Sequence, residues 1–381
     1  MARLGDLCDI LNGYAFKSEQ YVGSGIRIIR IANVQKGYIE DSTPVFYPID
    51  NNEYKKYELM EGDLLLSLTG NVGRVALLQK EFLPAALNQR VACLRIKDET
   101  ILSKSFLFNF LNSDYFENKC IESAKGVAQK NMSTEWLKEY DIPLLAIEKQ
   151  EKISKELDQI SNLISLRKQQ LLKLDELVKS RFIEMFGDPV YNPNRLPIKP
   201  LAELGSLDRG RSKHRPRNDP KLLGGPYPLI QTGEVSNAGL YITEYQNTYS
   251  ELGLKQSKMW NAGTLCITIA ANIAQTAILT FDACFPDSVV GFIPSDEIDA
   301  IYMHYWFSFF QKILDEQAPQ VAQKNINLKI LSELQVTIPS KEEQQEFVAF
   351  VKQTDKSKFE IQKSLEKLET LKKALMQKYF G

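Results

Sequence analysis

Residues 148–186 read EKQEKISKELDQISNLISLRKQQLLKLDELVKSRFIEMF, a stretch without proline or glycine. Its apolar residues recur at alternating steps of four and three, which is the spacing of a coiled-coil seam. Eight of the ten positions in this series are apolar: Ile153, Leu157, Ile160, Ile164, Leu171, Leu174, Val178 and Met185. Arg167 and Arg181 occupy the other two positions. The stretch therefore predicts one long helix with a narrow apolar stripe.

A second stretch, residues 341–380, keeps the same register at an offset of 194. Its apolar seam positions are Phe347, Val351, Ile361, Leu365, Leu368, Leu375 and Tyr379, and the interruptions are Thr354, Lys358 and Lys372. Two helices of about 39 residues are each roughly 58 Å long. The alternative is that each apolar stripe is simply the face of a domain core. The length without a break favours an antiparallel helix pair, whose charged interruptions set the register.

Other segments repeat at the same offset. Val-Ala-Gln-Lys-Asn occupies residues 127–131 and again residues 321–325. Glu148-Lys149-Gln150 matches Glu342-Glu343-Gln344, and Phe186-Gly187 matches Phe380-Gly381. The period is too long for a solenoid, whose repeats span roughly 20–50 residues. The chain is therefore a duplicated domain with a duplicated connector.

The two duplicated domains are rich in short β-like runs separated by Gly and Asn. In the first domain these runs are residues 26–31, 63–68, 74–78 and 91–96, followed by a helical stretch near residues 105–119. Gly62-Asp63-Leu64 matches Gly263-Thr264-Leu265, so the offset inside the domains is 201. Gly187 and the prolines that follow it end the first helix and begin a stiff linker.

These patterns predict an α+β protein with pseudo-two-fold symmetry, in which two β-rich domains alternate with two long helices that pair as an antiparallel coiled coil. The expected segments are a first domain (1–147), a central helix (148–187), a proline-rich linker (188–197), a second domain (198–340) and a C-terminal helix (341–381).

The composition narrows the function classes. The net charge is −1, from 47 basic and 48 acidic residues, which argues against a general polyanion binder but leaves local basic patches open. The five cysteines form no CxxC pair, as expected of reduced thiols in a cytoplasmic protein. No signal peptide or membrane-spanning run is evident. The chain has only two histidines, which argues against a histidine metal site or a Ser-His-Asp triad.

Enzyme motifs are also missing from the sequence. No GxxxxGK[ST] phosphate-binding loop occurs. Asn192-Pro193-Asn194-Arg195 lacks the second proline and the aromatic residue of an adenine methyltransferase motif. No Asp…Glu-x-Lys spacing distinguishes a nuclease site from ordinary surface carboxylates. We therefore expect a non-catalytic chain without a cofactor or metal.

The alternation of domains and helices resembles the specificity subunit of type I restriction–modification systems. The resemblance rests on Asp141-Ile142-Pro143-Leu144 before Glu148-Lys149-Gln150, on Ile338-Pro339-Ser340 before Glu342-Glu343-Gln344, and on the two aromatic-Gly helix ends. The proline does not match between the copies, since Thr337 stands opposite Pro143. The resemblance covers essentially the whole chain.

This resemblance implies that each domain recognises one half of an asymmetric, bipartite site in double-stranded DNA. The helices would set the spacing between the half-sites. They would also dock methyltransferase subunits, of which we expect two, and the restriction subunits would bind through these methyltransferase subunits. Catalysis would then belong to the partners, and specificity to this chain.

Candidate DNA-binding residues follow from chemistry, because bases are recognised by Arg, Lys, Asn and Gln side chains at groove edges. The first-domain candidates are Arg27, Arg30, Asn33, Lys36, Asn71, Arg74, Gln89 and Arg90. Gln231, Glu234, Asn272 and Gln275 stand opposite Arg30, Asn33, Asn71 and Arg74, and Asp287-Ser288 stands in place of Asn88. These differences predict that the domains recognise different sequences. Asn71 and Asn272 are equally explained as turn residues.

A basic loop begins the second domain. Arg209, Arg211, Lys213, Arg215 and Arg217 fall within ten residues, and interspersed Gly and Pro prevent a regular helix. Such a loop suits contacts with DNA phosphates, although a solvated charged loop has the same composition. The repeated Val-Ala-Gln-Lys-Asn segment also carries a basic residue, Lys130 in one copy and Lys324 in the other. Because the copies are identical, we expect them to have a structural or phosphate-binding role.

One alternative from another functional class remains open at this stage. A pseudo-dimeric coiled-coil scaffold that binds proteins instead of DNA also fits the near-neutral charge. Affinity for DNA that falls with salt concentration would distinguish the two interpretations.

Overall fold

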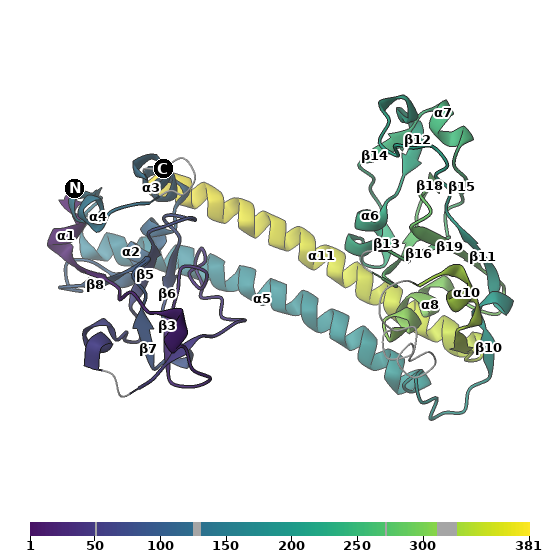
Figure 1. Ribbon diagram of the computed structural model, residues 1–381, viewed down its shortest axis with the longest axis horizontal. Helices are drawn as coiled ribbons and strands as arrows, with labels where there is room; N and C mark the ends of the chain where they lie inside the picture. Colours follow the sequence, from purple (N-terminus) through teal and green to yellow (C-terminus); the bar gives the residue numbers. More distant parts are fainter. Residues whose placement is uncertain (50–51, 125–130, 271–272, 311–325) are drawn as a thin grey trace. The chain divides into compact units, whose positions relative to one another are not determined.

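The computed structural model describes residues 1–49, 52–124, 131–270, 273–310 and 326–381. It divides into two compact units (Figure 1). Unit 1 comprises Met1–Lys168 together with Lys363–Gly381, and unit 2 comprises Gln169–Gln362. Both chain termini therefore lie in unit 1, and each unit contains one domain with parts of both long helices.

Unit 1 holds three small sheets. A four-stranded antiparallel sheet has the order β2-β8-β5-β6, a three-stranded sheet has the order β4-β3-β7, and β1 pairs with β9. The strands are β1 (Ala2–Arg3), β2 (Cys8–Asn12), β3 (Ile26–Ile29), β4 (Phe46–Tyr47), β5 (Leu64–Ser67), β6 (Val75–Leu77), β7 (Ala85–Leu87), β8 (Val91–Ile96) and β9 (Asp141–Ile142). The short helices are α1 (Leu4–Leu7), α2 (Lys104–Leu111), α3 (Asp114–Ser123) and α4 (Thr134–Glu139).

Unit 2 repeats this plan with two added strands, one in each of its two larger sheets. Its sheets have the orders β11-β19-β16-β17-β13, β14-β12-β18-β15 and β10-β20. The strands are β10 (Ile198–Pro200), β11 (Gly205–Arg209), β12 (Leu223–Leu229), β13 (Tyr241–Ile242), β14 (Asn247–Tyr249), β15 (Met259–Trp260), β16 (Leu265–Thr268), β17 (Thr276–Leu279), β18 (Ala283–Cys284), β19 (Val289–Pro294) and β20 (Gln335–Thr337). The short helices are α6 (Thr232–Asn237), α7 (Glu251–Lys255), α8 (Ala300–Phe307) and α10 (Leu328–Glu333).

Strand register shows that the domains are true copies. Leu64 pairs with Leu77 in unit 1, and Leu265 pairs with Ile278 in unit 2, so the offset between these strand pairs is 201. Each central strand pair of the smaller sheet is parallel, β3 with β7 and β12 with β18. The predicted α+β class with two repeated domains and long helices is confirmed.

The two long helices are α5 (Ile147–Phe186) and α11 (Lys341–Phe380). Within each unit their segments run antiparallel. In unit 1, Tyr379 donates to Glu156 at 2.6 Å and Lys168 pairs with Glu369 at 3.1 Å, so residue numbers rise along one helix as they fall along the other. In unit 2, Arg181 pairs with Glu346 at 2.7 Å, and Lys358 pairs with Asp175 at 2.5 Å.

Every seam residue predicted from the sequence is buried or half-buried. Leucines elsewhere on α5 are exposed, such as Leu166 and Leu172 at 55% and 64%. Two of the polar interruptions, Arg181 and Lys358, form the ion pairs between the helices of unit 2. The narrow stripe therefore serves helix pairing along its length and domain packing at its ends, where Leu157 and Val351 join the domain cores.

A buried glutamine fixes the start of each long helix to its own domain. The Gln150 amide accepts from the Ser103 backbone N–H at 3.0 Å and donates to the carbonyls of Ile101 and Leu145 at 2.9 and 2.7 Å. This residue is the last of the repeated Glu-x-Gln motif, and its side chain is fully buried. The amide satisfies backbone groups just before α2 and just before α5, and thereby locks the two helices together.

Gln344 makes the same three bonds in unit 2. Its amide accepts from the Asp299 N–H at 2.9 Å and donates to the carbonyls of Glu297 and Pro339, both at 3.0 Å. The repeated glutamine thus has a structural role that explains its recurrence in the sequence. Because three backbone groups depend on it, no other side chain of similar size can replace all of these bonds.

The aromatic end of each long helix packs into the other helix's domain. Phe380 of α11 contacts Phe106 and Phe110 of α2, at 5.5 and 5.6 Å between ring centroids. Phe186 of α5 contacts Tyr302 of α8 and Phe347 of α11, at 5.1 and 5.4 Å. Each unit is therefore closed by the beginning of one long helix and the end of the other.

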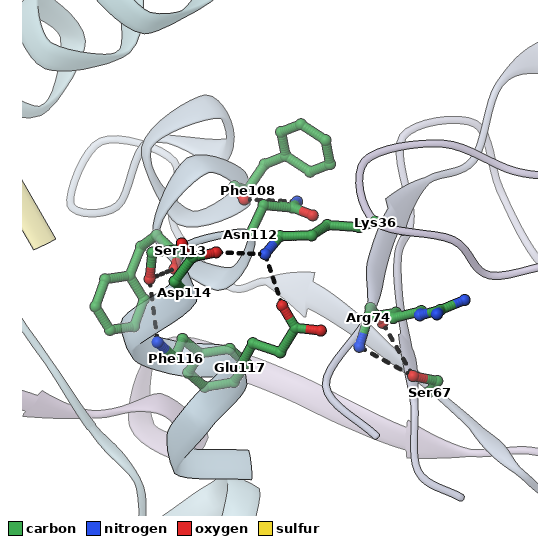
Figure 2. Close-up of polar contacts among 10 residues, drawn as sticks. Lys36, Ser67, Arg74, Phe108, Asn112, Ser113, Asp114, Phe116 and Glu117 are labelled. Atoms are coloured by element: carbon green, nitrogen blue, oxygen red, sulfur yellow. Dashed lines mark hydrogen bonds and ion pairs between the residues drawn. The ribbon is translucent and has the colours of Figure 1, made fainter. Parts of the chain in front are cut away.

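The helical stretch predicted near residues 105–119 consists of two helices, α2 and α3, separated by Asn112 and Ser113. Ser113 breaks the run, since its hydroxyl accepts from the Phe116 N–H at 3.2 Å and caps α3 (Figure 2). Asn112 donates to the Phe108 carbonyl at 2.9 Å and closes the end of α2. Ser and Asn favour such caps over helix interiors, so the break has a local cause.

Within the described ranges, no helix combines the length and apolarity needed to cross a membrane.

Replacing Gln344 with Ala should destabilise unit 2 by about 2–4 kcal/mol, because the Asp299 N–H and two carbonyls lose their partner in a buried site. Urea unfolding followed by tryptophan fluorescence measures the effect. Gln345→Ala is the matched control, because Gln345 is the exposed neighbour on the same helix, and it should change stability by less than about 0.5 kcal/mol. Equal unfolding midpoints for the two variants would contradict the anchoring role of Gln344.

Candidate nucleic-acid interface

Polar residues gather at one end of the four-stranded sheet of unit 1, around the turn from β5 to β6. The Leu68 N–H donates to the Arg90 carbonyl at 3.0 Å, and Asn131 forms a bridge with Thr69. Asn71 and Arg90 are exposed, whereas Arg74 is half-buried. The sheet end therefore brings together side chains that lie far apart in the sequence.

The same hydrogen bonds close this turn in both units. In unit 1 the Ser67 hydroxyl accepts from the Arg74 N–H at 3.0 Å, and the Ser67 N–H donates to the Arg74 carbonyl at 2.9 Å. In unit 2 the Thr268 hydroxyl accepts from the Gln275 N–H at 3.1 Å, and the Thr268 N–H donates to the Gln275 carbonyl at 2.9 Å. One scaffold therefore presents Arg74 in one domain and Gln275 in the other.

A left-handed residue precedes this position in each copy. Gly73 has φ +85° and Ala274 has φ +59°. Gly73 is glycine for a second reason, because a Cβ there would lie 2.8 Å from the Cβ of Cys120. The end of the turn therefore has the same backbone conformation in both copies, although Gly73 and Ala274 differ.

The residues after β3 and β12 have a local structural role. Asn33 is buried, and its side chain accepts from the Arg30 N–H at 2.8 Å. Glu234 does the same for the Gln231 N–H at 3.2 Å. The pair Asn33 and Glu234 therefore differs in chemistry but performs one capping function, which favours folding over base recognition at this position.

Arg27 and Lys36 are engaged in contacts within the domain. The Arg27 guanidinium lies over the rings of Phe46 and Phe82 and forms an ion pair with the buried Asp41. Lys36 bridges to Asp114 and Glu117 of α3, at 2.7 and 2.6 Å, as Figure 2 shows. The ammonium of Lys36 lowers the pKa of the Asp114 carboxyl by donating to it.

The side chains of Arg30 and Arg74 also form hydrogen bonds within the domain. Arg30 donates to the Thr43 carbonyl at 3.0 Å, and Arg74 donates to the Gln35 side chain. Gln89 and Arg90 remain exposed at the sheet end. Of the first-domain candidates, four are exposed (Lys36, Asn71, Gln89 and Arg90), three are half-buried (Arg27, Arg30 and Arg74), and Asn33 is buried.

The basic loop of unit 2 follows β11 and lies against the segment after β18. Arg209 donates through Nε to the Asp287 carbonyl at 2.5 Å, and Arg217 pairs with the Asp287 carboxylate. Arg215 lies 3.5 Å from the same carboxylate. Lys213 is exposed, and Arg211 is exposed with Asp208 at 3.9 Å. Lys258, which donates to Asp208, lowers the pKa of that carboxyl.

Backbone hydrogen bonds correct one pairing expected from the sequence. The Val91 N–H donates to the Asn88 carbonyl, and the Val289 N–H donates to the Pro286 carbonyl. Asn88 therefore corresponds to Pro286, and Gln89 corresponds to Asp287. The expected equivalence of Asn88 with Asp287 is wrong by one residue, because the offset here is 198 and not 199.

Three candidates, Lys130, Lys324 and Asn272, lie outside the described residues, as does most of the repeated Val-Ala-Gln-Lys-Asn segment. Sequence reasoning missed further polar residues, among them Ser212 within the basic loop and Asn247 on β14. A serine among arginines and an asparagine in a short strand give no signal of their own. Only the fold brings them together.

Comparison with known proteins agrees with this architecture. Residues 1–176 and 197–373 each match the family described as the type I restriction modification DNA specificity domain. The chain belongs to this family. The two matches correspond to the two copies of the domain, each with the greater part of the helix that follows it.

Similar curated proteins are named as specificity subunits of type I restriction enzymes. The specificity subunit of the type I restriction enzyme EcoAI from Escherichia coli is 35% identical over 42% of this chain and 27% of its own length. The MjaVIII specificity subunit from Methanocaldococcus jannaschii is 31% identical over 47% of this chain and 43% of its own length. The EcoBI specificity subunit from Escherichia coli is 22% identical over 99% of this chain and 84% of its own length. The matches to the first two thus span less than half of those relatives.

Solved structures share the fold. The S subunit of a type I restriction-modification system from M. genitalium has a TM-score of 0.59 at 15% identity, covering 100% of this chain and 95% of its own. A second structure comes from a study of complex assembly and conformational transition of the type I R-M system. Its chain has a TM-score of 0.60 at 18% identity, and the match covers 100% of this chain and 96% of that one.

The turn after β5 allows a test of which side chains stabilise the fold and which lie on the surface without stabilising it. Ser67→Ala should lower the free energy of unfolding by about 1–2 kcal/mol, because the buried hydroxyl closes the turn. Arg74→Gln copies the other domain and should cost less than about 0.5 kcal/mol. Urea unfolding of the two variants measures both values. An Arg74→Gln loss as large as that of Ser67→Ala would assign Arg74 to the fold and remove it from the surface.

Proposed function

We propose that this chain is the DNA sequence-specificity subunit of a type I restriction–modification complex. The observation that carries the proposal is that equivalent turns, with equivalent hydrogen bonds, present Arg74 in one copy of the family's domain and Gln275 in the other. Arg favours guanine and Gln favours adenine at base edges. Two domains with one scaffold and different exposed chemistry suit an asymmetric, bipartite site in double-stranded DNA.

The long helices support the second part of the proposal, which is assembly with partners. Large apolar side chains on α5 are exposed in the isolated chain, among them Leu163 at 45% and Leu177 at 48%. Exposed apolar positions of this kind suit a protein partner. We propose that the helices dock two methyltransferase subunits, that restriction subunits join through these, and that the partners supply all catalysis. A chain that acts on DNA in this way would work in the cytoplasm.

The basic loop of unit 2 provides the phosphate contacts of the proposal. Arg211 and Lys213 are exposed, and neither interacts with Asp287. Arginine and lysine at such positions release counterions when they neutralise DNA phosphates. The loop therefore contributes affinity that does not depend on base sequence.

Replacing both Arg211 and Lys213 with Gln should reduce the salt dependence of DNA binding. Each lost phosphate contact lowers the slope of log affinity against log salt concentration by about 0.9, so the double variant should lose a slope of about 2. Fluorescence anisotropy of the complex with its methyltransferase, on duplex DNA at several salt concentrations, measures the slope. Lys352→Gln with Lys356→Gln, on the exposed face of α11, is the matched control.

Affinity of the unaltered complex that stays flat as salt rises would contradict DNA phosphate binding and favour a protein-binding scaffold. An unchanged slope in the loop variant alone would place the phosphate contacts on other residues.

A further inference from the structure

A hollow of about 360 Å³ lies in unit 2 between the basic loop and the smaller sheet. Polar side chains from four separate segments line it: Ser212, Arg217, Gln231, Asn247 and Ser288. These segments are the basic loop, the residue before α6, strand β14 and the residues before β19. Leu223, Leu229, Tyr249 and Pro286 also line it, so the hollow combines apolar surface with hydrogen-bonding groups, a combination that suits a nucleotide base.

The buried, unpartnered hydroxyl of Ser212 favours a ligand-binding role for the hollow that this residue lines. The residue is 6% exposed, and its hydroxyl has no hydrogen-bond partner in the part of the chain that the structure describes. A buried hydroxyl without a partner costs free energy, and native proteins rarely leave one unsatisfied. A ligand in the hollow that donates or accepts a hydrogen bond would satisfy it.

Arg217 lines the hollow, and its side chain is oriented by an ion pair with Asp287. Its Nη2 pairs with one oxygen of the Asp287 carboxylate, which Arg215 approaches on the other oxygen at 3.5 Å. Arg215 also donates to the carbonyls of Ser212 and His214, so it holds the loop in place. Among the described residues Arg217 has Asp287 as its sole partner, and the rest of its guanidinium faces no protein acceptor.

We propose that this hollow is a base-recognition site of the second domain, in which Arg217, oriented by Asp287, recognises a guanine. The inference rests on the proposed function and assigns residues to one half of its DNA site. A guanidinium whose orientation is fixed loses less entropy when it donates two parallel bonds to guanine O6 and N7. Ser212 and Asn247 supply donors and acceptors to the same base pair or its neighbour.

The corresponding place in the first domain lacks this chemistry. The Arg211 N–H donates to the Phe285 carbonyl as the Tyr14 N–H donates to the Leu87 carbonyl, so Ala15 corresponds to Ser212. Gln89 corresponds to Asp287, as the backbone bonds around it show. The hydroxyl and the orienting carboxylate are therefore particular to the second domain, and the site confers specificity on one half of the target.

The test uses Arg217→Lys, which keeps the positive charge but removes the planar fork. The variant is expressed with its methyltransferase subunits in cells, and methylated bases are mapped across the genome. One guanine position in one half of the motif should lose roughly ten- to hundredfold discrimination, while the other half stays unchanged. Asp287→Asn should relax the same position more weakly, because Arg217 keeps its charge but loses its orientation.

Asp296→Asn is the matched control, since Asp296 is an exposed aspartate of the same domain and lies outside the hollow. Its motif should equal that of the unaltered chain. An unchanged motif in the Arg217→Lys complex would overturn the inference, and so would relaxation in both halves. Failure of the unaltered chain to direct any split motif would instead overturn the proposed function.

Discussion

The fold depends on two buried glutamine side chains at equivalent places, Gln150 and Gln344. Each satisfies three backbone groups that connect the start of a long helix to the helix of its own domain. Buried amides with complete sets of hydrogen bonds fix geometry, because any displacement leaves desolvated polar groups without partners. The domain and the helix that follows it thereby behave as one building block, used twice.

The second constraint is that each block is completed by the end of the other block's helix. Phe380 closes the core beside α2, and Phe186 closes the core beside α8. Neither unit has a complete core without helix residues from both halves of the chain. The duplication is thus symmetric where the core and the helix pairs are built. It is asymmetric at the sheet ends, where equivalent turns carry the half-buried Arg74 in one unit and the exposed Gln275 in the other.

The sequence predicts the parts of this structure whose signals are periodic or repeated. The long helices, their seam and the strands around residues 64 and 265 all follow from spacing. The break at Ser113 was missed because two capped short helices have the same apolar spacing as one longer helix. The anchoring by Gln150 was missed for another reason, since its partner Ser103 lies 47 residues away and sequence spacing does not report such contacts.

The candidate interface is predicted less well for the same reason. The structure places two of the predicted DNA-binding residues, Arg217 and Gln231, around one hollow, whereas Asn33, chosen by the same residue-type argument, caps a backbone N–H. Arginines and asparagines serve surfaces and folds alike, and the choice between these roles depends on neighbours that only tertiary structure supplies. Ser212 carries no sequence signal, because its importance arises from burial without a partner.

The central claim is that one anchored scaffold carries two different recognition surfaces. The most direct test replaces residues 199–340 with residues 2–146, so that the first domain stands in both places and each copy keeps its anchoring glutamine. Methylated bases are then mapped in cells that express this chain with its methyltransferase. The expected motif contains the same half-site twice. A motif that retains the original, asymmetric pair of half-sites would contradict the claim.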